Sequence, residues 1–266
     1  MVLLIALAIV FIISVLGVSG GLLLIYREKW AKLISKYLIS FAIGALLGVV
    51  FLDLLPEAVG NAGTVEAVRN VLIYSLVGIL VFYLLEKTLI WYHHHSIEHI
   101  WHGKHTVEEK VHPVGYLLTL GDSLHNFTDG LIIAASFLVD LKLGITTSLA
   151  VLFHEIPEEI GIFAVLLHAK FGKFKTILYS LLAQMSAVLG ALIGLFYLPL
   201  FTNFEAAILA FAAGGFIYIA STDLLPEIHR EKRLDKSLIQ IAVLVIGVFT
   251  IWYIGCLLYT SPSPRD

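Results

Sequence analysis

The sequence predicts an all-α polytopic membrane protein with eight transmembrane helices in a 3+2+3 inverted-repeat arrangement. Three observations carry this prediction: the composition, the number of apolar segments and an internal repeat. Of the 266 residues, 59% are hydrophobic and only 14% are charged. Soluble domains are about half apolar and about a quarter charged. The composition therefore excludes an ordinary soluble domain and indicates several membrane-spanning segments.

Eight segments are long and apolar enough to cross a bilayer as helices, which takes about 20 residues each. We expect residues 1–255 to form a single transmembrane domain. Residues 256–266 are expected to be a non-native tail, because CLLYTSPSPRD breaks an apolar span and resembles read-through translation of a sequencing-library adapter. The eight expected spans cover residues 2–25, 35–56, 69–91, 114–138, 143–168, 174–199, 204–225 and 237–255.

Basic residues predict the orientation, because cytoplasmic loops carry an excess of Lys and Arg. The loops that follow spans 1, 3, 5 and 7 hold thirteen basic residues, whereas the loops on the opposite side have only Arg69 and Lys142. The first set is therefore expected in the cytoplasm, with both termini extracytoplasmic. The short loops favour the cell (inner) membrane of a prokaryote. The thirteen residues are Arg27, Lys29, Lys32, Lys36, Lys104, Lys110, Lys170, Lys173, Lys175, Arg230, Lys232, Arg233 and Lys236.

The sequence DLLPE occurs twice, at Asp53–Glu57 and at Asp223–Glu227. The first copy ends span 2 and the second ends span 7, and these two spans are expected to run in opposite directions. The repeat therefore relates spans 1–3 to spans 6–8, with spans 4 and 5 at the centre. Inverted repeats with a site near the membrane midplane are typical of transporters.

Two polar clusters interrupt spans 4 and 5. Span 4 contains HNFTDG from His125, and span 5 contains HEIPEE from His154. Each cluster has a second polar residue after the histidine and a carboxylate four residues after it. Positions i and i+4 share one helix face, so each cluster can direct its groups at one point. The candidate metal ligands are His125, Asn126, Asp129, His154, Glu155 and Glu158.

Both histidines lie about 11 residues into their spans, roughly 16 Å deep at 1.5 Å per residue. Ionisable groups at this depth are costly and mark ion pathways. Imidazole and carboxylate ligands without thiolate suit Zn²⁺, and also Fe²⁺, Mn²⁺ or Cd²⁺. We therefore expect a midplane metal-ion site between spans 4 and 5 and no organic cofactor. For His125 alone, a hydrogen bond across the bundle is an equally good interpretation.

Seven of the eleven histidines fall in the expected cytoplasmic loop 92–113. Histidine-rich tracts bind metal weakly and flexibly. We favour a metal-collecting or sensing loop over a solvated spacer. The seven are His93, His94, His95, His99, His102, His105 and His112.

On these residues the chain resembles the ZIP (Zrt/Irt-like) family of divalent metal-ion transporters. HNFTDG fits the family pattern HNxxDG, and HEIPEE is similar to the HELPHE of one subgroup, with Glu158 where that subgroup has histidine. The resemblance implies the same six metal-site residues, from His125 to Glu158, and a homodimer. Many members also have a glutamate in span 6 that completes a second metal position, where this chain reads QMSAVLGALIG from Gln184.

The function predicted is transport of divalent metal ions, zinc first, into the cytoplasm through the site between spans 4 and 5. The expected partners are divalent metal ions and the bilayer, without nucleic acid, and the protein is not expected to be an enzyme. An intramembrane zinc metalloprotease is the alternative, because HEIPE comes close to H-E-x-x-H. Glu158 at the fifth position and Pro157 inside the motif argue against it.

Overall fold

The computed structural model describes residues 2–60, 64–101, 114–200 and 205–259, and these contain helices and no β-strand. The predicted helical class is thus confirmed for this part of the chain. The elements are α1 (Val2–Val49), η1 (Val50–Leu54), α2 (Leu55–Gly60), α3 (Val65–Trp101), α4 (Val114–Val139), α5 (Leu141–His168), α6 (Lys173–Tyr197), α7 (Glu205–Ile219), η3 (Ala220–Leu224), α8 (Leu225–His229) and α9 (Leu234–Tyr259).

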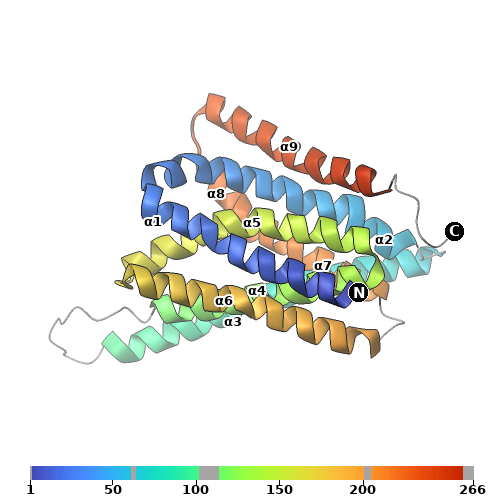
Figure 1. Cartoon of the computed structure of the whole chain (residues 1–266), viewed down its shortest axis with the longest axis horizontal. Coiled ribbons are helices and arrows are strands. Elements are labelled where there is room, and N and C mark those ends of the chain that lie inside the picture. Colours follow the sequence, from blue (N-terminus) through green and yellow to red (C-terminus); the bar gives the residue numbers. More distant parts are fainter. Residues whose placement is uncertain (1, 61–63, 102–113, 201–204, 260–266) are drawn as a thin grey trace.

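Helix α1 covers both of the first two expected spans. Its backbone leaves helical geometry at Arg27, where φ is −143° and ψ is 50°. Figure 1 shows the dark-blue first part running away from the N-terminus and the lighter-blue second part running back. We call residues 2–26 the first limb of α1 and residues 28–49 its second limb.

Within the described part of the chain, five helical stretches are long and apolar enough to cross a membrane. The chain is therefore an integral, multi-pass membrane protein. Helices α4 and α5 are not among the five, and they are the two that carry the predicted polar clusters. The count of eight spans stays a prediction. The five stretches are Val2–Gly60, Val65–Leu85, Lys173–Leu200, Ala206–His229 and Leu234–Leu257.

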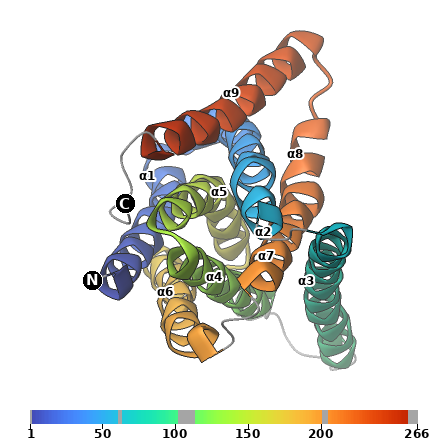
Figure 2. The same cartoon turned by 90° about the vertical axis from the view of Figure 1, so that its right-hand side faces the viewer.

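Helices α4 and α5 lie side by side at the centre of the bundle (Figure 2). The first limb of α1 packs on α5, where Gly20 brings the backbones so close that a Cβ would lie 1.9 Å from the carbonyl oxygen of Ile156. Helix α6 packs on α4, and α3 packs on α7. The second limb of α1 packs on α9 through Gly44. Small residues at such contacts are typical of membrane helices, since they let backbones approach.

Both copies of DLLPE adopt the same local structure. In each copy the aspartate lies in a π-helical turn, η1 for Asp53 and η3 for Asp223, and the proline follows in the next α-helical segment. The N–H of Leu55 bonds to the carbonyl of Val50, five residues back, and Leu225 bonds likewise to Ala220. A proline cannot donate to the carbonyl four residues earlier and its ring crowds that carbonyl, which favours the wider turn. The two copies of the motif therefore share a local backbone structure, and the inverted repeat of whole spans stays a prediction.

The segment after α8 is tied to the second limb of α1 by an ion pair. Lys36 Nζ lies 3.1 Å from Glu231 Oε2. The hydrogen bond from Lys36 holds the pKa of the Glu231 carboxyl below its usual range. Because the pKa of Glu231 is lower in the folded than in the unfolded protein, the ion pair stabilises the folded state at any pH above the unfolded-state pKa. This stabilisation is lost as the pH falls through the folded-state pKa.

We expect Glu231→Gln to lower the thermal midpoint in detergent by only about 2 °C at pH 7, because such pairs contribute little. As the pH falls below the usual glutamate pKa of about 4.3 and through the lower folded-state pKa of Glu231, the difference from wild type should shrink toward zero, since the wild-type carboxyl is then protonated too. A difference that grows on acidification would contradict this assignment.

Two sequence predictions fall partly outside the described residues. Of the histidine-rich loop 92–113, residues 92–101 belong to the end of α3, and the rest lies outside the described ranges. Of the expected non-native tail, residues 256–259 continue α9, and residues 260–266 lie outside.

Candidate metal centre

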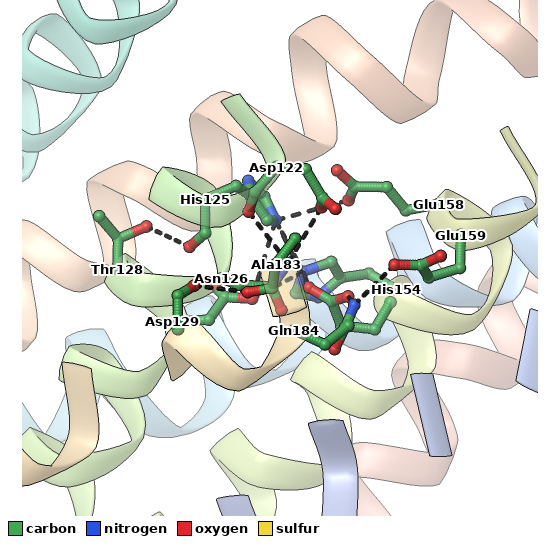
Figure 3. A network of polar contacts seen from close by, with 12 residues as sticks. Asp122, His125, Asn126, Thr128, Asp129, His154, Glu158, Glu159, Ala183 and Gln184 are labelled. Atoms are coloured by element: carbon green, nitrogen blue, oxygen red, sulfur yellow. Dashed lines mark hydrogen bonds and ion pairs between the residues drawn. The ribbon is translucent and has the colours of Figure 1, made fainter. Parts of the chain in front are cut away.

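Two neighbouring helices bring four of the predicted ligands to one point inside the bundle. Helix α4 contributes His125 and Asp129, one turn apart, and α5 contributes His154 and Glu155. One ligand atom from each of the four lies within 4.8 Å of the others. Asp129, His154 and Glu155 are buried, and His125 is 14% exposed. Figure 3 shows the side chains from the two helices pointing toward one another.

The two imidazoles face each other across the helix interface. His125 Nε2 and His154 Nε2 are 3.3 Å apart. Asp129 Oδ2 lies 3.0 Å from His154 Nε2 and 3.7 Å from His125 Nε2. A carboxylate of α4 therefore reaches the histidine of α5, so that both helices are needed to form the cluster.

Two glutamates of α5 complete the cluster from the other side. Glu155 Oε1 lies 3.8 Å from His125 Nε2 and 3.7 Å from His154 Nε2. Glu158 Oε2 lies 3.4 Å from His125 Nε2, and its side chain is 21% exposed. Glu158 thus approaches from the more open side, next to the partly exposed His125.

Asn126 is buried beside the cluster, but its amide group is engaged elsewhere. Its Nδ2 donates to the backbone oxygen and to Oδ1 of Asp122, both at 3.0 Å. These bonds hold the amide against the preceding turn of α4 (Figure 3). Of the six predicted ligands, Asn126 is the one whose nitrogen the structure directs away from the histidine pair.

The ring of His154 is oriented by the backbone of its own helix. His154 Nδ1 lies 3.2 Å from the carbonyl oxygen of Ala150. A carbonyl can only accept, so this contact assigns a proton to Nδ1; in the neutral ring the lone pair then belongs to Nε2, which faces the cluster. Metal-binding histidines characteristically donate their other ring N–H to such a group.

Sequence reasoning missed a buried polar group next to the cluster. Glu159 is fully buried, and it accepts hydrogen bonds from Ser180 Oγ at 2.5 Å and from Gln184 Nε2 at 3.1 Å. Gln184 Nε2 also donates to Glu155 Oε2. The spacing of Glu155 and Glu159, four residues on one helix face, was the available signal.

Several carboxylate oxygens of the cluster are buried without a donor. Among the described residues, Asp129 Oδ1, Glu155 Oε1 and Glu158 Oε2 have no hydrogen-bond partner. Buried charges are stable only when paired or bound to metal. Two imidazoles and three carboxylates form a nitrogen–oxygen donor set of the kind that Zn²⁺ and similar divalent ions prefer. The arrangement can bind one divalent cation between α4 and α5.

Comparison with known families agrees with this donor set. The sequence pattern of the family described as "ZIP Zinc transporter" matches residues 1–114 and 92–255. The chain belongs to the ZIP zinc transporter family. The resemblance seen in the sequence is thus confirmed. The family consists of transporters, so the prediction that the protein is not an enzyme is confirmed as well.

Curated relatives of this ZIP protein are similar over most of its length. Zinc transporter ZIP13 of Pongo abelii is 36% identical over 255 residues, which cover 90% of this chain and 72% of the relative. Zinc transporter ZIP13 of Homo sapiens is 32% identical over 284 residues, covering 90% and 75%. Zinc transporter YKE4 of Saccharomyces cerevisiae is 32% identical over 234 residues, covering 80% and 66%.

Proposed function

We propose that this ZIP protein transports divalent metal ions, with Zn²⁺ as its first substrate, into the cytoplasm through a site between α4 and α5. The observation that carries the proposal is the convergence of His125, Asp129, His154 and Glu155 within 4.8 Å inside a membrane bundle. The names of the relatives support zinc as the substrate. Fe²⁺, Mn²⁺ and Cd²⁺ suit the same donor set, and no organic cofactor is needed for such a cargo.

The proposed ligands are the six residues predicted from the sequence, and they differ in how directly they bind the ion. His125, Asp129, His154 and Glu155 bind the ion directly, and Glu158 joins from the more exposed side. Asn126 would contribute its amide oxygen, because its nitrogen is held by Asp122. A ligand set without thiolate binds zinc less tightly than a cysteine cage, which allows the ion to leave.

The proposed topology has eight spans in the 3+2+3 order. Two features support it: α1 folds back at Arg27, and α4 and α5 have 26 and 28 residues. At 1.5 Å per residue each is about 40 Å long, enough for a hydrocarbon core of about 30 Å. The matching π-helical turns support the inverted repeat. Both termini are then extracytoplasmic, and the site lies near the midplane between the two halves.

Other features of the proposal rest on the sequence alone. They are a homodimer, a metal-collecting role for the histidine-rich cytoplasmic loop 92–113, a single transmembrane domain over 1–255 and a non-native tail at 256–266. The prokaryotic inner membrane also stays a prediction, and the relatives named above, all eukaryotic, lend it no support. The protease alternative is less well supported than transport, because the family transports zinc and the fifth position of the H-E-x-x-H motif is Glu158.

Uptake of radioactive Zn²⁺ by proteoliposomes tests the proposal. Wild type should show saturable uptake, and His125→Ala and His154→Ala should each abolish it, because each removes a nitrogen ligand. His229→Ala at the end of α8 is the matched control, since it removes an exposed histidine from a helix that contributes nothing to the cluster. Uptake that survives both cluster substitutions would refute the proposed site, and no uptake by folded wild type would refute transport.

A further inference from the structure

The carboxylate of Glu155 is held at one oxygen and left free at the other. Its Oε2 accepts a hydrogen bond from Gln184 Nε2 of α6. Its Oε1 has no hydrogen-bond partner among the described residues and lies 3.7 Å from His154 Nε2. One oxygen is therefore occupied by the amide, and the other is presented to the cluster.

The same amide nitrogen also donates a hydrogen bond to Glu159. Gln184 Nε2 donates to Glu159 Oε1 at 3.1 Å, and Ser180 Oγ takes the second oxygen at 2.5 Å. Both oxygens of Glu159 are thus satisfied by α6, although Glu159 is as deeply buried as Glu155. These bonds turn the Glu159 carboxylate toward α6, whereas the carboxylate of Glu155 still reaches the histidines.

The first limb of α1 holds Gln184 in place from the other side. Ser14 Oγ donates to the backbone oxygen of Gln184 at 3.0 Å. At Gly17 a Cβ would lie 2.9 Å from Gln184 Oε1 and 3.2 Å from its Nε2, so the absence of a side chain there makes room for the amide. The Gln184 side chain is fully enclosed, with 1% of the residue exposed. It is therefore fixed by α1 and α6 together.

We propose that Gln184 is a positioning residue for the metal site: its amide, seated against Gly17, restricts Glu155 to one metal-binding oxygen and keeps Glu159 turned away from the ion. This inference rests on the proposed function, since it concerns the ion bound by the same cluster. A neutral amide suits the position because it supplies N–H donors to two adjacent carboxylates without adding a charge. An apolar side chain would remove the donor to Glu155 Oε2 and to Glu159 Oε1; Glu159 would keep only its bond from Ser180, and the Glu155 carboxylate would be free to rotate.

Gln184→Met tests the role of the amide, because methionine has similar length and no N–H donor. We expect a 10- to 100-fold weaker zinc affinity, about the loss seen when a group that orients a ligand is removed. The absorption spectrum of bound Co²⁺ should lose intensity, because Glu155 can then bind through two oxygens and raise the coordination number. Gln240→Met is the matched control, since Gln240 is a buried glutamine of α9, which contributes nothing to the cluster.

Binding must be counted at the cluster rather than at the histidine-rich loop. Each variant of the full chain is therefore compared with the same variant carrying His154→Ala, and the difference in bound Zn²⁺ or Co²⁺ is assigned to the cluster. If wild type shows no such difference, the proposed function and this inference both fail. If wild type binds and Gln184→Met matches it in affinity and spectrum, only the inference fails.

Gly17→Ala provides a second test that leaves every polar group in place. The three atoms nearest to the added Cβ all belong to the end of the flexible Gln184 side chain, so the helices need not separate. It should change the Co²⁺ spectrum in the same direction as Gln184→Met. Gly161→Ala on α5 is its control, because a Cβ there meets no described atom within 4 Å. A Gly17→Ala protein with the wild-type spectrum would overturn the role given to the seating of the amide.

Discussion

Asp129→Asn is expected to weaken zinc binding at the cluster by more than 100-fold and to remove saturable uptake. Asparagine keeps the size of the side chain, so the packing between α4 and its neighbours should survive. The substitution removes a negative charge that lies 3.0 Å from His154 Nε2 and is fully buried. Substituting a residue that only orients a ligand lowers metal affinity by about 10- to 100-fold. Removing a charged ligand of a dication from a low-dielectric site should lower the affinity more.

Asp122→Asn is the matched control for this experiment. It makes the same chemical change on the same helix, also at a buried position, but Asp122 bonds to Asn126 rather than to the histidines. We expect a loss of about tenfold or less, the low end for a residue outside the ligand set. Equilibrium binding of zinc to purified protein, with His154→Ala subtracted, measures both. Equal losses in the two variants would mean that general charge, not ligation by Asp129, governs affinity.

The sequence was sufficient to predict the two halves of this cluster, because both depend on local spacing. His125 with Asp129, and His154 with Glu158, share a helix face by the 3.6-residue period alone. Their equal depth in spans 4 and 5 predicted that antiparallel packing would bring them level. The structure shows α4 and α5 in contact and four of the candidate ligands together. Helical periodicity and span length were enough to predict this cluster, because it involves only two helices that follow each other in the sequence.

The contacts of Gln184 could not be predicted in this way. Gln184 meets Glu155 only because α6 and the first limb of α1 dock against α5, and nothing in the local sequence fixes that rotation. The π-helical turns were also missed, since DLLPE reads locally as a helix with a proline. Their wider hydrogen bonding follows from where Pro56 and Pro226 fall within helices that continue on both sides. The Gln184 contacts, in contrast, depend on packing between distant segments.

The second large effect is expected from Gly130→Ala, at a close approach of α4 and α6. A Cβ at residue 130 would lie 1.9 Å from the carbonyl oxygen of Ala187, and one at Gly190 would lie 2.0 Å from that of Phe127. The obstacle is backbone on both sides, so the helices must move apart rather than a side chain turning aside. Overpacking costs about 1–3 kcal/mol, which corresponds to a fall in thermal midpoint of about 2–10 °C for a chain of this size.

The displacement should also reach the site, because Gly130 follows Asp129 directly on α4. We therefore expect Gly130→Ala to lose most zinc uptake even at temperatures where the protein stays folded.

Gly161→Ala should behave differently: it adds the same methyl group to the other site helix, but into open space. Since alanine favours helix over glycine by about 1 kcal/mol, that variant should be as stable as wild type or slightly more so. Thermal unfolding followed by tryptophan fluorescence, together with proteoliposome uptake, compares the two. Equal behaviour of both variants would mean that the α4–α6 contact does not control the geometry of the metal site.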